Sequence, residues 1–277
     1  MLFVFYPIVG TIYMSFLDRK TGNFVGFQNY NYVLFEKVYP LVKAKNIILG
    51  KFPMGALTHN VIWIAIHLPL TVFFGLLLAV LLRDVKGGAI IKSIIFLGMI
   101  IPMVVGGVLM RFMFDIDAGI VNAVLRFIGL GSFARDWTFF PDTALLSVIL
   151  GSVWIWTGFC MIVYSAGLQN IPVEIYEAAK IDGASRWKTF WRITVPMLKS
   201  TTLVVVTMTV LWELKIFDIV YVATFGGPGG ASRVLAFDMY LEAFYSYNYN
   251  TASAIAVLLT LLTFGFAAYM VSRMAKS

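Results

Sequence analysis

Long, mostly apolar segments recur along the whole of this chain of 277 residues, and they constrain its fold more than any other feature. A helix needs about 20 residues to cross a hydrocarbon core about 30 Å thick, because each residue rises about 1.5 Å. We therefore expect an all-α, polytopic membrane protein with about six transmembrane helices in one domain, residues 1–277. The expected helices are Leu2–Leu17, Leu57–Leu82, Ala89–Phe114, Thr143–Leu168, Ser200–Ala223 and Thr251–Arg273.

The composition agrees with a membrane protein. Hydrophobic residues make up 60% of the chain and charged residues 13%, whereas soluble domains carry about 25% charged residues. The formal charge of +7 does not indicate nucleic-acid binding, because the basic residues are spread over the connecting loops. The first apolar segment lacks the basic start and the cleavage site of a signal peptide, and we expect that a further N-terminal stretch precedes it.

The few residues that could bind a metal or form an active site do not form a recognisable pattern. Cys160 stands alone in an apolar run and is expected to be a small buried hydrophobe. His59 and His67 lie eight residues apart with no carboxylate beside them, so we expect no metal site. No serine–histidine or paired-carboxylate arrangement indicates a catalytic residue, so an enzyme is not expected.

A polar loop, residues 169–199, connects the fourth and fifth apolar segments. Since both of its ends enter the membrane, the loop must lie on one face. Its five basic side chains place it on the cytoplasmic side by the positive-inside rule: Lys180, Arg186, Lys188, Arg192 and Lys199. The long first loop is then external although it is also basic, so charge alone leaves the opposite orientation open.

Local signals predict two short helices in this loop. Pro172 suits the first turn of a helix over Val173–Ile181. Asp182–Gly183 is a turn signal, and Ser185 can cap a second helix that ends before Pro196. Such a hairpin can dock on another protein or lie on the lipid surface as an amphipathic element.

The amino-acid sequence of the loop resembles a known motif. Glu177-Ala178-Ala179, then Gly183 after three residues, and a later Val195-Pro196 pair resemble the EAA motif of ABC importer permeases, in which the residue before proline is usually Leu. The preceding residues 167–172 are similar to the carbohydrate-importer branch that contains the maltose and glycerol-phosphate permeases. Shorter strings at 6–7, 26–30, 226–228 and 252–254 extend the resemblance along nearly the whole chain.

The resemblance implies a function for the loop. In that family the loop inserts into a cleft on a cytoplasmic ATPase and transmits its nucleotide-driven closure to the membrane helices. The residues that would couple this chain to the ATPase are Glu177, Ala178, Ala179, Asp182 and Gly183. The chain has no GxxxxGK[ST] phosphate loop, so ATP and Mg²⁺ would bind to the partner ATPase and no cofactor to this chain.

The resemblance also implies a set of partners. They are a second homologous permease, two P-loop ATPase subunits, an extracytoplasmic solute-binding protein, a sugar substrate and membrane lipid, with no nucleic acid. The expected location is the cell membrane of a prokaryote.

The fifth segment contains ionisable residues, which are functional candidates because burying them in lipid is expensive. Lys215 and Asp218 are three residues apart and could pair on one helical face. One interpretation is an internal ion pair that fixes this helix to its neighbours. In the other, Glu213 or Lys215 binds sugar hydroxyls. A third hypothesis, an ion-coupled secondary transporter, would use Glu213, Lys215 and Asp218 as a relay, but we see no inverted repeat.

The fourth segment offers an aromatic face. Ser152, Trp156 and Phe159 are spaced for one side of a helix, where they either pack against other helices or stack on a sugar ring. Alignment on Glu177 adds residues of the fifth segment near the family's sugar site. The predicted substrate-binding set is Ser152, Trp156, Phe159, Trp212, Glu213, Lys215 and Ile216. This set departs from the family's asparagine-rich pattern, so it does not indicate which sugar is bound.

Overall fold

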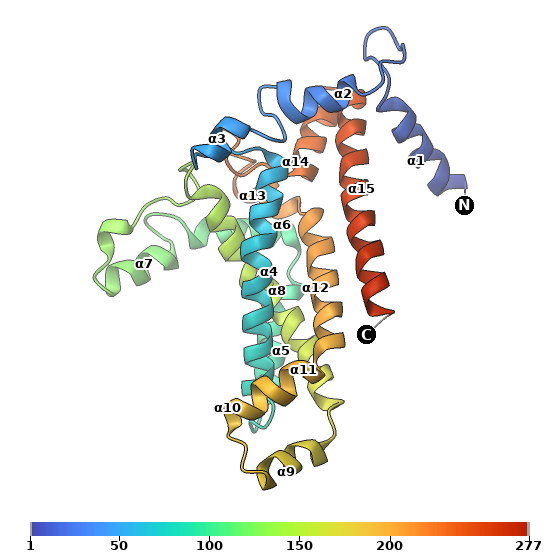
Figure 1. Cartoon of the computed structure of the whole chain (residues 1–277). Coiled ribbons are helices and arrows are strands. Elements are labelled where there is room, and N and C mark those ends of the chain that lie inside the picture. The colour runs from blue at the N-terminus through green and yellow to red at the C-terminus, as the bar shows by residue number, and fades with distance from the viewer. Residues whose placement is uncertain (1, 276–277) are drawn as a thin grey trace. The chain divides into compact units, whose positions relative to one another are not determined.

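The computed structural model describes residues 2–275, and its regular elements within that range are all helices (Figure 1). An isolated bridge joins Leu17 to Phe24. The prediction of an all-α membrane protein is confirmed. The chain forms two compact units, each assembled from three stretches, and the long helices α4, α8, α12 and α15 contribute residues to both units. The expectation of one domain stays a prediction.

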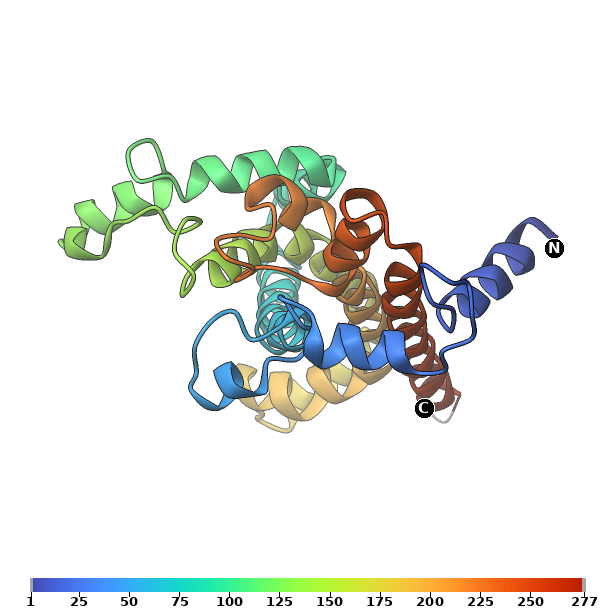
Figure 2. The ribbon, with the colours of Figure 1, turned by 90° about the horizontal axis from the view of Figure 1, so that it is seen from above.

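Unit 1 consists of residues 1–65, 102–151 and 212–265. Its short elements are α1 (Leu2–Met14), α2 (Gln28–Asn31), η1 (Tyr32–Glu36), α3 (Ala44–Ile48), α6 (Met103–Met113), α7 (Ile120–Phe127), η2 (Gly131–Phe133), α13 (Asp218–Ala223), α14 (Leu235–Tyr240) and η4 (Leu241–Tyr245). It also contains most of α15 (Tyr249–Met274). Seen from above, α2 and η1 continue one another as a single short rod (Figure 2).

Unit 2 consists of residues 66–101, 152–211 and 266–277. It holds most of α4 (Ala56–Leu81), α8 (Ala144–Gln169) and α12 (Lys199–Leu214). Its other elements are α5 (Gly88–Ile100), α9 (Val173–Ile181), α10 (Arg186–Thr189), η3 (Phe190–Thr194) and α11 (Val195–Met197). The polar loop of the sequence therefore lies within this unit.

Three helices, α4, α8 and α15, are each 26 residues long and apolar enough to cross a membrane. They confirm the predicted second, fourth and sixth segments within two residues at each end. The described helices give up to five spans if each of two bent pairs counts as one. The helix of the first segment, α1, has 13 residues, three fewer than the 16 predicted for residues 2–17.

Two of the predicted segments, 89–114 and 200–223, are not single helices but are each interrupted. The third segment divides into α5 and α6, which bend by 100°. Pro102 precedes α6 and has an extended ψ of 135°; its ring also disfavours a helical conformation at Ile101. The fifth segment divides at residues 215–217, after α12 ends at Leu214.

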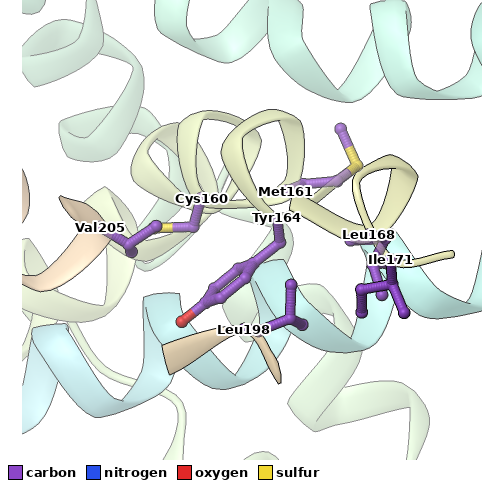
Figure 3. Packing of buried hydrophobic residues seen from close by; sticks show 8 residues of the cluster. Cys160, Met161, Tyr164, Leu168, Ile171, Leu198 and Val205 are labelled. Carbon is purple, nitrogen blue, oxygen red and sulfur yellow. The ribbon is translucent and has the colours of Figure 1, made fainter. Parts of the chain in front are cut away.

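A buried apolar cluster holds unit 2 together (Figure 3). Tyr164 and Met161 of α8 are fully buried in it, and so is Cys160, which confirms the expected role of that residue as a buried hydrophobe. Leu198 and Val205 bring the start of α12 into the same cluster. The core therefore connects the chain on both sides of the polar loop.

Small residues let the helices of unit 2 approach closely, as is common between membrane helices. A Cβ atom built on Gly75 of α4 would overlap the Cβ of Cys160 on α8. On α8 itself, a Cβ on Gly158 would lie 3.0 Å from the carbonyl oxygen of Ile95 on α5. Helix α8 is accordingly the best buried candidate span, with 67% of its apolar window inside the protein.

Gly75→Ala should destabilise the protein by about 1–3 kcal/mol, the usual effect of overpacking, because α4 and α8 would have to separate. Gly265→Ala on α15 is the matched control, since nothing lies within 4 Å of a Cβ built there. The thermal unfolding midpoint in detergent should fall for the first variant and stay or rise for the second. Equal midpoints would contradict the close α4–α8 contact.

Candidate functional site

Helix α9 carries the motif of the polar loop and has well-defined ends. Pro172 precedes it with a ψ of 137°, and Glu174 lies in the first turn, where a negative charge suits the helix dipole. Lys180 lies in the last turn, where a positive charge does the same. The helix spans Val173–Ile181, as predicted. After it, Gly183 adopts a φ of +70°, a conformation that most other residues avoid.

The predicted coupling residues do not all point the same way. Ala179 is buried, whereas Glu177, Ala178, Asp182 and Gly183 are exposed. A Cβ built on Gly183 would meet no atom within 4 Å. The four exposed residues therefore form an accessible surface, whereas the buried Ala179 packs against the rest of the chain.

The second helix of the hairpin begins as predicted but ends later. The Ser185 hydroxyl accepts a hydrogen bond from the Lys188 amide at 3.3 Å and caps α10. The helical path then continues through η3, a π-helical turn, into α11 (Figure 1). The expectation that it ends before Pro196 is wrong, because Pro196 sits at the start of the new α-helical turn, where a missing amide is tolerated.

Two contacts hold α9 against the rest of the hairpin and the end of α4. The Tyr176 hydroxyl lies 3.3 Å from the Thr194 hydroxyl. The Arg83 guanidinium lies 4.5 Å from the centre of the Tyr176 ring, a cation–π distance. The Ala184 amide donates a 2.9 Å hydrogen bond to the carbonyl of Ala179, which closes the turn after α9. The helix is therefore held through Tyr176, near its middle, and its C-terminal turn is closed by a backbone hydrogen bond.

The predicted substrate residues of the fourth segment lie on α8 in unit 2. Ser152 and Trp156 are buried, and Phe159 is half-buried. The His67 ring of α4 meets the Trp156 ring edge-on at 6.1 Å and hydrogen-bonds the main chain of Ser152. These contacts show helix packing by Ser152 and Trp156, and their role in binding a substrate stays a prediction.

The predicted substrate residues of the fifth segment lie in unit 1, in the last turn of α12 and directly after it. Glu213 is fully buried, Ile216 is buried, Trp212 is half-buried and Lys215 is exposed. Lys215 belongs to the residues that interrupt the helix, and Asp218 begins α13. The expectation that these two charges share one helical face is therefore wrong, because the helix ends before either.

A buried asparagine supports the break between α12 and α13. The Asn60 amide nitrogen donates to the carbonyls of Glu213 and Leu214, at 3.0 and 3.4 Å. Its amide oxygen accepts from the Leu235 amide at 2.9 Å. These backbone groups belong to a helix end and a helix start, which leave carbonyls and amides without intrahelical partners. Asn60 thus satisfies three backbone groups at once.

The neighbouring residue, His59, also hydrogen-bonds backbone groups. Its Nε2 accepts a hydrogen bond from the Met54 amide at 2.9 Å, so its Nδ1 donates to the carbonyl of Arg233 at 2.7 Å. Sequence analysis missed both structural roles. The available signal was an adjacent pair of polar residues, His59 and Asn60, in an otherwise apolar segment.

Unit 1 also contains a buried charge cluster that the sequence did not indicate. The Lys37 Nζ lies 3.0 Å from a carboxylate oxygen of Asp238 and 3.4 Å from one of Glu242. Arg233 lies 3.3 Å from the other oxygen of Asp238 and stacks over Tyr39 at 4.1 Å. Burial raises the pKa of the Asp238 carboxyl, while Lys37 and Arg233 act to lower it. The cluster connects segments about 200 residues apart.

A cavity of about 640 Å³ lies beside α15 within unit 1. Lys215 lines it, together with four hydroxyl-bearing residues, Thr11, Tyr240, Tyr249 and Ser253. Most of its remaining lining is apolar. An amine and hydroxyl-bearing side chains on a mostly apolar wall could orient the hydroxyl groups of a small solute.

Asn60→Ala should lower the free energy of unfolding by about 2–4 kcal/mol, because buried backbone groups lose their partners at about 1–3 kcal/mol each. Asn250→Ala is the matched control, since Asn250 donates one hydrogen bond at an exposed site, to Met14. Thermal unfolding of the purified chain measures the difference. If both variants unfold at the same temperature, Asn60 does not support the break.

Comparison with known proteins gives the family. Residues 71–276 match the family model described as "Binding-protein-dependent transport system inner membrane component". A probable ABC transporter permease protein of Pyrococcus horikoshii is 54% identical over 98% of this chain and 92% of its own length. An osmoprotective compounds uptake permease of Synechocystis is 37% identical over 92% and 88%.

A trehalose/maltose transport system permease protein of Thermococcus litoralis is 31% identical over 96% of this chain and 86% of its own length. A solved bacterial ABC transporter involved in the import of alginate has the same fold, with a TM-score of 0.79 over 99% of this chain and 90% of its own, at 21% identity. The motif on α9 and the family match over most of the chain agree. This chain belongs to the inner-membrane components of binding-protein-dependent transport systems, and it is a multi-pass membrane protein.

Proposed function

We propose that this chain is the permease subunit of an ABC importer that moves a sugar or oligosaccharide into a prokaryotic cell. The observation that carries the proposal is the exposed motif on α9, Glu177, Ala178 and the Asp182–Gly183 turn, on a helix fixed by Tyr176. A rigid helix that presents a small side chain suits insertion into a cleft of another protein. It can also transmit movement, which a flexible tether cannot.

The proposed partners follow from the family. Two P-loop ATPase subunits would bind ATP and Mg²⁺ and grip α9, and a second permease of the same family would complete the pathway. A solute-binding protein outside the cell would deliver the substrate, and lipid would surround the apolar helices. ATP binding would close the ATPases and open the membrane helices outward; hydrolysis would reset them. No cofactor binds to this chain itself.

A sugar is the proposed substrate class. The trehalose/maltose permease of Thermococcus litoralis is named for such a substrate. The osmoprotective compounds permease of Synechocystis is named for a different class, so the uptake assay should include both. The exposed Lys215 and the hydroxyls in the 640 Å³ cavity support a hydroxyl-rich solute. We keep Ser152, Trp156, Phe159, Trp212, Glu213 and Ile216 as proposed substrate residues.

An ion-coupled secondary transporter is disfavoured. The two broken helices are a feature of that class, but the family match covers residues 71–276 and names a binding-protein-dependent system. Uptake by proteoliposomes that hold this chain, its sister permease and the ATPases separates the two hypotheses. An importer requires ATP and the binding protein, whereas a secondary transporter works with an ion gradient alone.

Gly183→Asp should abolish uptake while the chain still inserts, because the new side chain would project at the docking surface. Gly87→Asp is the matched control: Gly87 has a similar φ, +76° against +70°, and no atom within 4 Å of its built Cβ. The two variants therefore carry the same backbone strain. Uptake that is lost equally in both, or retained in both, would contradict docking at Gly183.

Lys215→Met should raise the KM for uptake about tenfold, equivalent to about 1.4 kcal/mol of lost binding, with the unfolding midpoint unchanged. Lys199→Met at the start of α12 is the control, because Lys199 is exposed and does not line the cavity. A lower midpoint with an unchanged KM would assign Lys215 a structural role instead.

A further inference from the structure

A second, smaller cavity lies within unit 2, between the end of α4 and the hairpin formed by α9, α10 and η3. Its volume is about 240 Å³, about eight times the volume of about 30 Å³ that a water molecule occupies in the liquid. The polar residues that line it are Arg83, Asp84, Tyr176, Lys180, Arg186, Thr189 and Thr194. Such a volume accommodates a small hydrated anion.

The charge of this cavity is unbalanced. Three cationic side chains line it, Arg83, Lys180 and Arg186, against the one carboxylate of Asp84. Among residues 2–275, no carboxylate forms an ion pair with any of the three cations. Residues 183–212 contain no acidic residue. The acidic residues that precede this stretch in the hairpin do not line the cavity; they are Glu174, Glu177 and Asp182.

The cations are held around one fixed ring. Tyr176 supports Arg83 at 4.5 Å on its face and binds Thr194 through its hydroxyl at 3.3 Å. Arg83 follows α4, Lys180 is in the last turn of α9, and Arg186 is in α10. An anion in the cavity would therefore contact three separate elements, which no ion pair joins among the described residues.

We propose that this cavity binds a phosphate group and that the bound group ties the α9 hairpin to the end of α4. Guanidinium and ammonium groups form strong, charge-assisted hydrogen bonds with phosphate oxygens. Hydroxyl groups of the cavity supply further donors. The phosphate comes either from the headgroup of an anionic lipid or from a soluble phosphate compound. The site includes Lys180 of α9, which is exposed, but none of the predicted coupling residues, and it does not depend on the identity of the transported solute.

The experiment uses the full chain in nanodiscs and measures its thermal unfolding midpoint. One arm adds inorganic phosphate to discs of phosphatidylcholine and compares it with chloride at equal ionic strength. The other arm replaces part of the phosphatidylcholine by phosphatidylglycerol, with no phosphate in the buffer. A soluble ligand raises the midpoint in the first arm, and a lipid headgroup raises it in the second.

The test variant is Arg83→Gln/Lys180→Gln/Arg186→Gln. The matched control, Lys188→Gln/Arg192→Gln/Lys199→Gln, removes the same charge from the same region, but its residues do not line the cavity. We expect phosphate, or phosphatidylglycerol, to bind the test variant at least tenfold more weakly than it binds the wild type. Its affinity for the control variant should stay within twofold of its affinity for the wild type. If the triple variant does not fold, the single variant Lys180→Gln replaces it in the test. We expect this single variant to weaken binding by an intermediate amount.

A midpoint that rises in either arm, and that the test variant loses while the control keeps it, supports the site and identifies the source of the phosphate. Two results overturn the proposal. The first is a wild-type midpoint that neither phosphate nor phosphatidylglycerol raises. The second is an equal loss in the test and control variants, which would indicate general attraction to a basic surface.

Discussion

The position of Tyr176 is the constraint on which the proposed coupling depends. A short helix of nine residues, such as α9, has little stability of its own. It remains in place because the Tyr176 hydroxyl binds Thr194, its ring supports Arg83, and Ala179 is buried. The exposed part of the motif is thus attached to the segment that leads directly into α12. In the proposed function, this connection is the path by which a movement of α9 would reach a membrane helix.

Each break in a membrane helix leaves backbone groups without intrahelical partners. Apolar surroundings do not solvate free backbone groups, so a broken helix must find partners within the protein. Asn60 supplies them where α12 ends, and His59 binds the nearby chain at Arg233. The ion pair of Lys37 with Asp238 belongs to the same unit and joins distant segments. In this apolar chain, buried polar residues stabilise the irregular backbone segments. Long regular helices do not require such partners, because their backbone groups bind one another.

The sequence predicted what depends on local patterns. Apolar length gave α4, α8 and α15, and turn and capping residues gave α9 and the start of α10. It did not predict the break before Lys215, because Asn60, which binds the backbone there, is more than 150 residues away in the sequence. The role of His67 beside Trp156 was missed for the same reason. Residue spacing identifies a helical face, but only the fold shows which neighbour covers it.

Thiol cross-linking at Ala178 tests the central claim most directly. The only cysteine, Cys160, is buried, so Ala178→Cys introduces a single accessible thiol on the exposed face of α9. In native membranes, a bifunctional thiol reagent should join this residue to a separate ATPase polypeptide, and nucleotide should change the yield. If the reagent reaches Ala178→Cys but forms no adduct with an ATPase, with or without nucleotide, α9 is not the coupling element.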